Sequence, residues 1–185
     1  MEQPETSIVN PDLELRVSRL ERAALEQNVF DVVAAVRIWR GRNEIRNRHT
    51  GQSAGPVLHI RTTANYSLVG RPDVREQASA EPGGADLPTA ALSLPIYGLY
   101  RDELRAQHSV RVRLDEGKLG GADGHSFDGE RPALFSFVPA EALRHPGGNL
   151  RLPEQSIQLS HAMYSDEAVV VAQVDVTVRR HGVSV

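Results

Sequence analysis

The side chains that most often bind metals, the histidines, are spread through the chain one per segment. None stands at the His-x-His or His-x-x-x-His spacing that places two ligands side by side. The cupin signature is therefore missing. We expect surface or hydrogen-bonded histidines and no metal site. The residues concerned are His49, His59, His108, His125, His145, His161 and His181.

Acidic residues gather in the segment 115–130, among several glycines. Asp115, Asp123, Asp128 and Glu130 could supply carboxylate oxygens to calcium. Their spacing matches neither the EF-hand nor the glycine-rich calcium repeat. The favoured interpretation is a hairpin loop in which glycine supplies positive φ and aspartate caps turns, and calcium binding stays open.

Basic residues crowd the end of one predicted strand and the loop that follows it. Guanidinium groups form bidentate hydrogen bonds with carboxylates and phosphates. Few aromatic residues accompany them, so the stacking surface used by single-stranded nucleic acids is missing. An acidic patch on a partner subunit is the favoured ligand. The predicted subunit-interface residues are Trp39, Arg40, Arg42, Arg46 and Arg48.

The motifs of nucleophilic and phosphate chemistry do not support an enzyme. GQSAG at residues 51–55 has the spacing of a serine elbow, but its flanks do not fit a strand-to-helix turn. The chain has no cysteine, which excludes disulfides, thiolate zinc sites and a cysteine nucleophile. We predict a protein that is not an enzyme and uses no cofactor.

The charge balance argues against a dedicated nucleic-acid binder, because the formal net charge is −3. Lys118 is the only lysine among the 21 basic residues. Codon bias of a GC-rich genome is the favoured explanation, and selection for guanidinium groups at subunit interfaces is the alternative. The first residues do not resemble a signal peptide, and no apolar run reaches the length of a membrane span.

The elements that must position these side chains are mainly strands, because apolar residues alternate with polar ones over most of the chain. Val110, Val112 and Leu114 show the pattern most clearly, and the segment near the C-terminus repeats it at greater length. Pro95 and Pro153 predict edge positions or bulges. The predicted strands cover residues 29–40, 57–63, 66–69, 92–100, 109–115, 133–138, 150–160 and 168–180.

These eight strands predict an all-β fold, an eight-stranded jelly-roll or β-sandwich barrel over residues 29–185. Residues 1–28 form a predicted N-terminal arm or short helix, with Asn10, Pro11 and Asp12 at its start. Residues 101–107 and 139–144 are predicted to form single helical turns. The connections 41–56, 70–91 and 116–132 are long for a compact domain, and we expect them to become ordered against neighbouring subunits.

The strand count, the long last strand, the extended loops and the missing catalytic site together resemble a viral shell protein. The chain is similar in size and strand pattern to the small single β-barrel major capsid proteins of icosahedral, internal-membrane viruses of halophilic archaea and thermophilic bacteria. The resemblance implies an upright barrel in a virion shell, assembly with like subunits and a second related capsid protein, an underlying membrane, and no cofactor.

Two other functions remain open on the sequence alone. A β-sandwich module that binds a glycan or peptide would have a groove lined by aromatic residues, the candidates being Trp39, Tyr66, Tyr97, Tyr100 and Tyr164. A jelly-roll enzyme whose site has no recognisable motif is the third alternative, because paired carboxylates of the glycosidase kind can be far apart in the chain. No specific nucleic-acid partner is expected.

Overall fold

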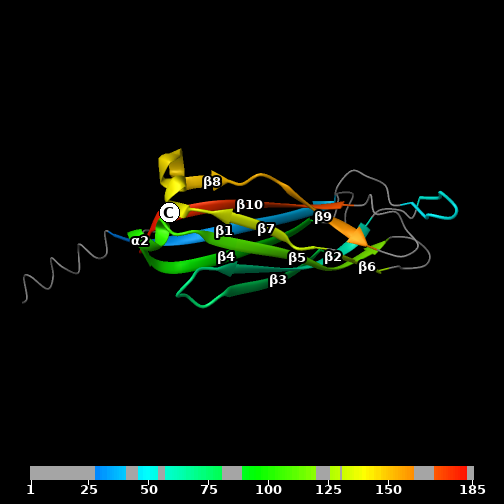
Figure 1. Cartoon of the computed structure of the whole chain (residues 1–185), viewed down its shortest axis with the longest axis horizontal. Coiled ribbons are helices and arrows are strands. Elements are labelled where there is room, and N and C mark those ends of the chain that lie inside the picture. The colour runs from blue at the N-terminus through cyan, green and yellow to red at the C-terminus, as the bar shows by residue number, and fades with distance from the viewer. Residues whose placement is uncertain are drawn as a thin grey trace, which may run out of the picture.

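The computed structural model describes residues 28–40, 46–53, 57–80, 89–119, 126–129, 131–160 and 169–182. Two antiparallel sheets face each other and form an elongated β-sandwich (Figure 1). The described strands are β1 (Val29–Arg40), β2 (Val57–Ser67), β3 (Val74–Ala80), β4 (Thr89–Tyr100), β5 (His108–Leu119), β6 (Ser126–Gly129), β7 (Ala133–Phe137), β8 (Asn149–Arg151), β9 (Gln155–Ser160) and β10 (Val169–Arg180). The short helical turns are α2 (Arg101–Leu104), η1 (Pro139–Arg144) and η2 (Pro146–Gly148).

One sheet has β1 at its centre, paired with β4 on one side and with β10 on the other. β8 and β9 pair with β10 beyond it. In the other sheet β2 lies between β3 and β5, and β6 and β7 pair with β5. The sheets are linked at one edge, where Asp128 of β6 lies opposite Ser160 of β9.

The core fills the space between the sheets with the residues that alternation predicted to point inward. Phe30, Val32, Ala34, Val36 and Ile38 of β1 are all buried. They meet a second layer from the other sheet, which includes Ile60, Tyr66, Val112, Leu114 and Phe135. Burial of this apolar area is the dominant force that holds the two sheets together.

Four features of the predicted fold are confirmed. The chain is all-β with two sheets. Pro95 lies on β4, which ends the strand order and is therefore an edge strand. Pro153 falls in the break between β8 and β9, where no ladder bond is needed. The predicted helical turns are present as α2 and η1.

The predicted strand boundaries were wrong in four places, and the described strands number ten. The predicted strand 150–160 is divided at Pro153 into β8 and β9, because proline has no N–H to donate to a ladder. The predicted strand 57–63 and the first two residues of the predicted strand 66–69 form one strand, β2, because buried Ala64 continues the ladder between them. The expected loop 70–91 contains β3, an exposed edge strand with polar residues at Arg75, Glu76 and Gln77. The expected loop 116–132 contains the end of β5 and the four-residue β6.

Part of the predicted connection 41–56 is also structured. An isolated bridge joins Arg46 and Ser53, and Asn47 Oδ1 accepts hydrogen bonds from the backbone N–H groups of His49 and Thr50. Residues 1–27 lie outside the described residues, so the predicted N-terminal arm and its boundary at residue 28 stay predictions. Within the described ranges, no helix has the length and apolar character needed to cross a membrane.

Candidate functional site

The outer face that β4 and the middle of β1 form has few long polar side chains, whereas β10 carries Gln173, Asp175 and Arg179 on the same side. Between the inward-pointing residues, β1 and β4 turn small or apolar side chains outward. Their register places Val33 opposite Pro95 and Ala35 opposite Ser93. Ala35, Ala91 and Ser93 are exposed. We call this surface the small-residue face, made of Val33, Ala35, Ala91, Ser93 and Pro95.

Charged groups of both signs border the small-residue face. Arg37 lies over the ring of Trp39, with its guanidinium carbon 5.0 Å from the ring centroid. Asp175 of β10 lies opposite Ala35 and accepts a hydrogen bond from Arg151 at 2.9 Å. The small-residue face is therefore bordered by one positive and one negative side chain, Arg37 and Asp175.

The outer face of the other sheet is cationic by contrast. Antiparallel pairing aligns Arg75, Asn65 and Arg111 in one row across β3, β2 and β5. The next row holds Gln77, Thr63 and Arg113. Neighbouring side chains in such a row are about 5 Å apart, so the three arginines belong to one surface.

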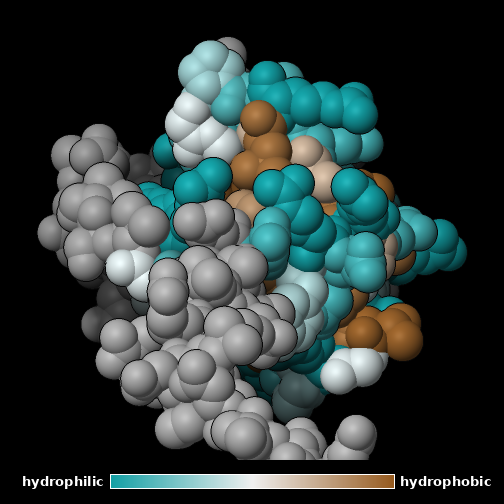
Figure 2. Space-filling model, turned by 90° about the vertical axis from the view of Figure 1, so that its left-hand side faces the viewer, coloured by the Kyte–Doolittle hydropathy of each residue, from teal (hydrophilic) through white to brown (hydrophobic). Residues whose placement is uncertain are grey.

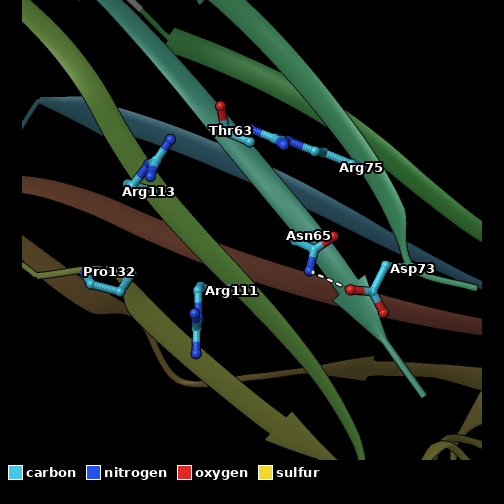
Figure 3. A pocket seen from close by; sticks show the side chains of 7 residues that line it. All are labelled: Thr63, Asn65, Asp73, Arg75, Arg111, Arg113 and Pro132. Atoms are coloured by element: carbon cyan, nitrogen blue, oxygen red, sulfur yellow. Dashed lines mark hydrogen bonds between the residues drawn. The ribbon is translucent and has the colours of Figure 1, made fainter. Parts of the chain in front are cut away.

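These side chains line an open pocket with a volume of about 680 Å³. Figure 3 shows Arg75 extending from β3 across β2 toward Thr63, while Arg111 and Arg113 stand on β5. Asn65 lies between them and donates a hydrogen bond to Asp73 at 3.1 Å. The residues that line the pocket are Thr63, Asn65, Asp73, Arg75, Arg111, Arg113 and Pro132.

The three arginines differ in how far their charge is already compensated. Arg113 Nε donates to Asp115 at 2.8 Å, and the hydroxyl of Thr63 donates to the other oxygen of Asp115. Arg75 and Arg111 are exposed, and neither has an ion-pair partner among the described residues. Two cations are thus available to an anionic ligand in a pocket that contains one lining carboxylate, Asp73.

A second polar cluster is buried at the end of the sandwich near α2. The hydroxyl of Tyr66 bonds to Nδ1 of His108, and Nε2 of His108 donates to the carbonyl oxygen of Glu103 at 2.7 Å. The Glu103 carboxylate accepts two hydrogen bonds from Arg71, both at 2.8 Å. Arg71 also donates to the carbonyl of Gly98.

The electrostatics of this cluster follow from burial and pairing. Burial raises the pKa of Tyr66 and lowers the pKa of His108. The hydrogen bond from Arg71 is the main cause that lowers the pKa of Glu103. Tyr66 and His108 are completely buried, so a ligand has no access to them. We assign the cluster a structural role: it joins β2, β5 and α2.

Three of the five predicted interface residues have side chains that the structure describes. Trp39 is half-buried beside the small-residue face, whereas Arg46 and Arg48 lie in the bridged hairpin, shown in cyan beyond the strand ends in Figure 1. Arg46 donates to the carbonyl of Gly51 there. Arg42 and the side chain of Arg40 lie outside the described residues, so their role stays a prediction.

The histidines and acidic residues do not converge in the part of the chain that the structure describes. No group of three or more His, Asp or Glu side chains there could hold a metal ion. Asp115 is engaged by Thr63 and Arg113. Asp123, Glu130, His125, His161 and the side chain of Asp128 lie outside the described residues, and calcium binding therefore stays open.

Some of the four tyrosines were expected to line an aromatic groove with Trp39, and Tyr66 is fully buried and cannot be one of them. Tyr97 and Tyr100 are exposed at the end of β4. Figure 2 looks onto this end of the molecule and shows apolar residues as separate patches in a mostly hydrophilic surface. Tyr164 lies outside the described residues. Among the described residues that line the cationic pocket, none is aromatic.

No model of a known protein family matches this chain, and no curated protein sequence matches it significantly.

Proposed function

We propose that the chain is a structural subunit of a viral capsid shell, which assembles with like subunits through the small-residue face. The observation that carries the proposal is the contrast between the two outer faces of the sandwich. Exposed strand positions of a monomeric sandwich ordinarily hold long polar side chains, whereas Ala35, Ala91 and Ser93 leave the surface over β4 and the middle of β1 smooth. A smooth sheet face allows close packing against another surface.

The charges favour a second copy of the chain as the occupant of this face. Arg37 and Asp175 have opposite signs and lie on neighbouring strands, two residues apart in register. When two copies pack face to face around a two-fold axis, Arg37 of one copy can lie near Asp175 of the other. The same contact then occurs twice, as in every isologous interface. The outer face of the other sheet is cationic, so two copies of that face repel each other. That face is therefore available to a different partner.

The area is large enough for a specific contact. β1 has 12 residues. It is therefore about 40 Å long, and four neighbouring strands span roughly 19 Å. The whole outer face of this sheet, which includes the small-residue face and its charged border, thus measures roughly 750 Å². A contact over all of it is close to the 800 Å² or so that each partner buries in a standard interface. The eight-stranded jelly-roll topology, the related second capsid protein and the virion location belong to the same proposal.

Light scattering coupled to size-exclusion chromatography tests the proposal, with electron micrographs to detect closed particles. Ser93→Arg places a long charged side chain on the small-residue face, and Ser136→Arg is the matched control. Ser93 and Ser136 are both exposed and both lie on strands paired on one side only, but in different sheets. We expect the wild type and Ser136→Arg to assemble and Ser93→Arg to stay monomeric. A wild type that is monomeric at every concentration and salt condition contradicts the proposal.

A further inference from the structure

The cationic pocket has a spacing that suits one kind of ligand. Arg111 and Arg113 are two residues apart on β5, so their side chains leave the same face about 6.8 Å apart. Arg75 lies two strands away from β5, roughly 9.6 Å across the sheet. Two of the arginines therefore lie along β5 and the third lies to one side of them on β3. This arrangement is too extended to surround a single small anion.

We propose that this pocket binds an extended acidic peptide segment of a partner protein. Same-side residues of an extended peptide repeat every two positions at the same spacing of about 6.8 Å. Carboxylates at alternate positions can therefore meet Arg111 and Arg113 together, while Arg75 reaches the segment from β3. The terminal nitrogens of Arg113 remain available because Asp115 engages its Nε.

The polar groups between the arginines favour a peptide over other polyanions. Asp73 is an acceptor in the lining, and Asn65 turns its amide nitrogen toward Asp73, which leaves its carbonyl oxygen as a second acceptor. An extended peptide has backbone N–H donors for such acceptors, whereas the phosphates and deoxyriboses of a DNA backbone have none. The seven described lining residues also include no aromatic side chain on which bases would stack.

Fluorescence anisotropy with designed peptides tests the ligand class. The first probe alternates acidic and neutral residues, (Glu-Thr)₄, and the second has the same composition in blocks, Glu₄Thr₄. A third probe, (Gln-Thr)₄, lacks the charge, and a single-stranded oligothymidine of similar length represents nucleic acid. We expect the alternating acidic peptide to bind most tightly and (Gln-Thr)₄ to bind at least tenfold more weakly.

Substitution of the exposed arginines locates the binding. Arg111→Gln and Arg75→Gln each weaken binding of (Glu-Thr)₄ on the order of tenfold, since each removes a charge-assisted contact. Arg179→Gln is the matched control, because Arg179 is an exposed strand arginine of the other sheet. It should bind the peptide as the wild type does. All three positions are exposed, and circular dichroism verifies that each variant is folded.

The inference is independent of the shell proposal, because the pocket and the small-residue face lie on different sheets. A monomeric wild type that binds (Glu-Thr)₄ supports the pocket and contradicts only the shell. No binding of (Glu-Thr)₄ at millimolar concentration, equal binding of the block peptide, or unchanged binding by Arg111→Gln and Arg75→Gln overturns the peptide site. Arginine-dependent binding of the oligothymidine that exceeds peptide binding also overturns it.

Discussion

The hydroxyl of Tyr66 and the imidazole of His108 form a hydrogen bond inside the sandwich, where neither side chain is exposed. Nε2 of His108 bonds to the carbonyl oxygen of Glu103 and must therefore carry the proton. Nδ1 is then the acceptor and Tyr66 the donor. This arrangement holds His108 neutral, and both partners are satisfied without water.

Stability should depend on pH because burial lowers the pKa of His108. In the unfolded chain a histidine protonates near pH 6.5. Below that pH, His108 binds a proton in the unfolded state but stays neutral in the folded state. The free energy of unfolding therefore falls with pH until the pKa of His108 in the folded state is reached. The slope is at most about 1.4 kcal/mol per pH unit. Urea unfolding between pH 8 and roughly pH 5.5 should show the decline, and His108→Gln should reduce it. A His145→Gln control, at an exposed position, should leave it unchanged.

Removal of the Tyr66 hydroxyl should destabilise the fold. Tyr66→Phe leaves Nδ1 of His108 buried without a donor, which costs about 1–3 kcal/mol. Tyr97→Phe makes the same chemical change at a side chain that is 62% exposed, and it should cost less than about 0.5 kcal/mol. Equal unfolding midpoints for the two variants would show that the buried hydrogen bond contributes nothing.

Arg71 should be intolerant of lysine. Its guanidinium donates twice to Glu103 and once to Gly98, and an ammonium group cannot reproduce that planar fork. Arg71→Lys should lower the free energy of unfolding by about 1–2 kcal/mol. Arg151→Lys is the control, because the Arg151–Asp175 pair is more exposed; an effect below about 0.5 kcal/mol is expected. A larger loss in Arg151→Lys than in Arg71→Lys contradicts this interpretation.

Gly148 should resist substitution more than Gly70, although both have positive φ. A Cβ at Gly148 would lie 2.5 Å from the carbonyl oxygen of Val178, whereas one at Gly70 meets nothing within 4 Å. Gly70→Ala bears the left-handed backbone cost of about 1–2 kcal/mol. Gly148→Ala adds a backbone clash worth about 1–3 kcal/mol more. Thermal unfolding that ranks the two variants in the opposite order would contradict the packing of η2 on β10.

The strands that could be predicted best from the sequence are those with one solvent-exposed face and one buried face. β10 alternates from Val170 to Val178, and the structure buries that face completely. β2 was divided because Thr62, Thr63 and Ala64 are buried in succession, which breaks the alternation. Thr63 is covered on the outer face through its contacts with Asp115 and Gln77. β3 was missed because an edge strand needs few apolar residues.

The cationic pocket could be predicted only in part. Arg111 and Arg113 were visible as the polar face of one predicted strand, but their union with Arg75 depends on the register of β3, β2 and β5. That pairing joins residues far apart in the chain and leaves no local signal. The buried contact between Tyr66 and His108 was missed for the same reason, since a lone tyrosine and a lone histidine carry no spacing pattern.

Cross-linking through single introduced cysteines tests the docking face most directly, because the chain has no cysteine of its own. Ala35→Cys places one thiol in the middle of the small-residue face, and Ser136→Cys places one on the other sheet. With a short bismaleimide, Ala35→Cys should yield a covalent dimer and Ser136→Cys should remain monomeric. Equal yields from the two variants, or a dimer from Ser136→Cys alone, would contradict self-association through the β4-β1-β10 sheet.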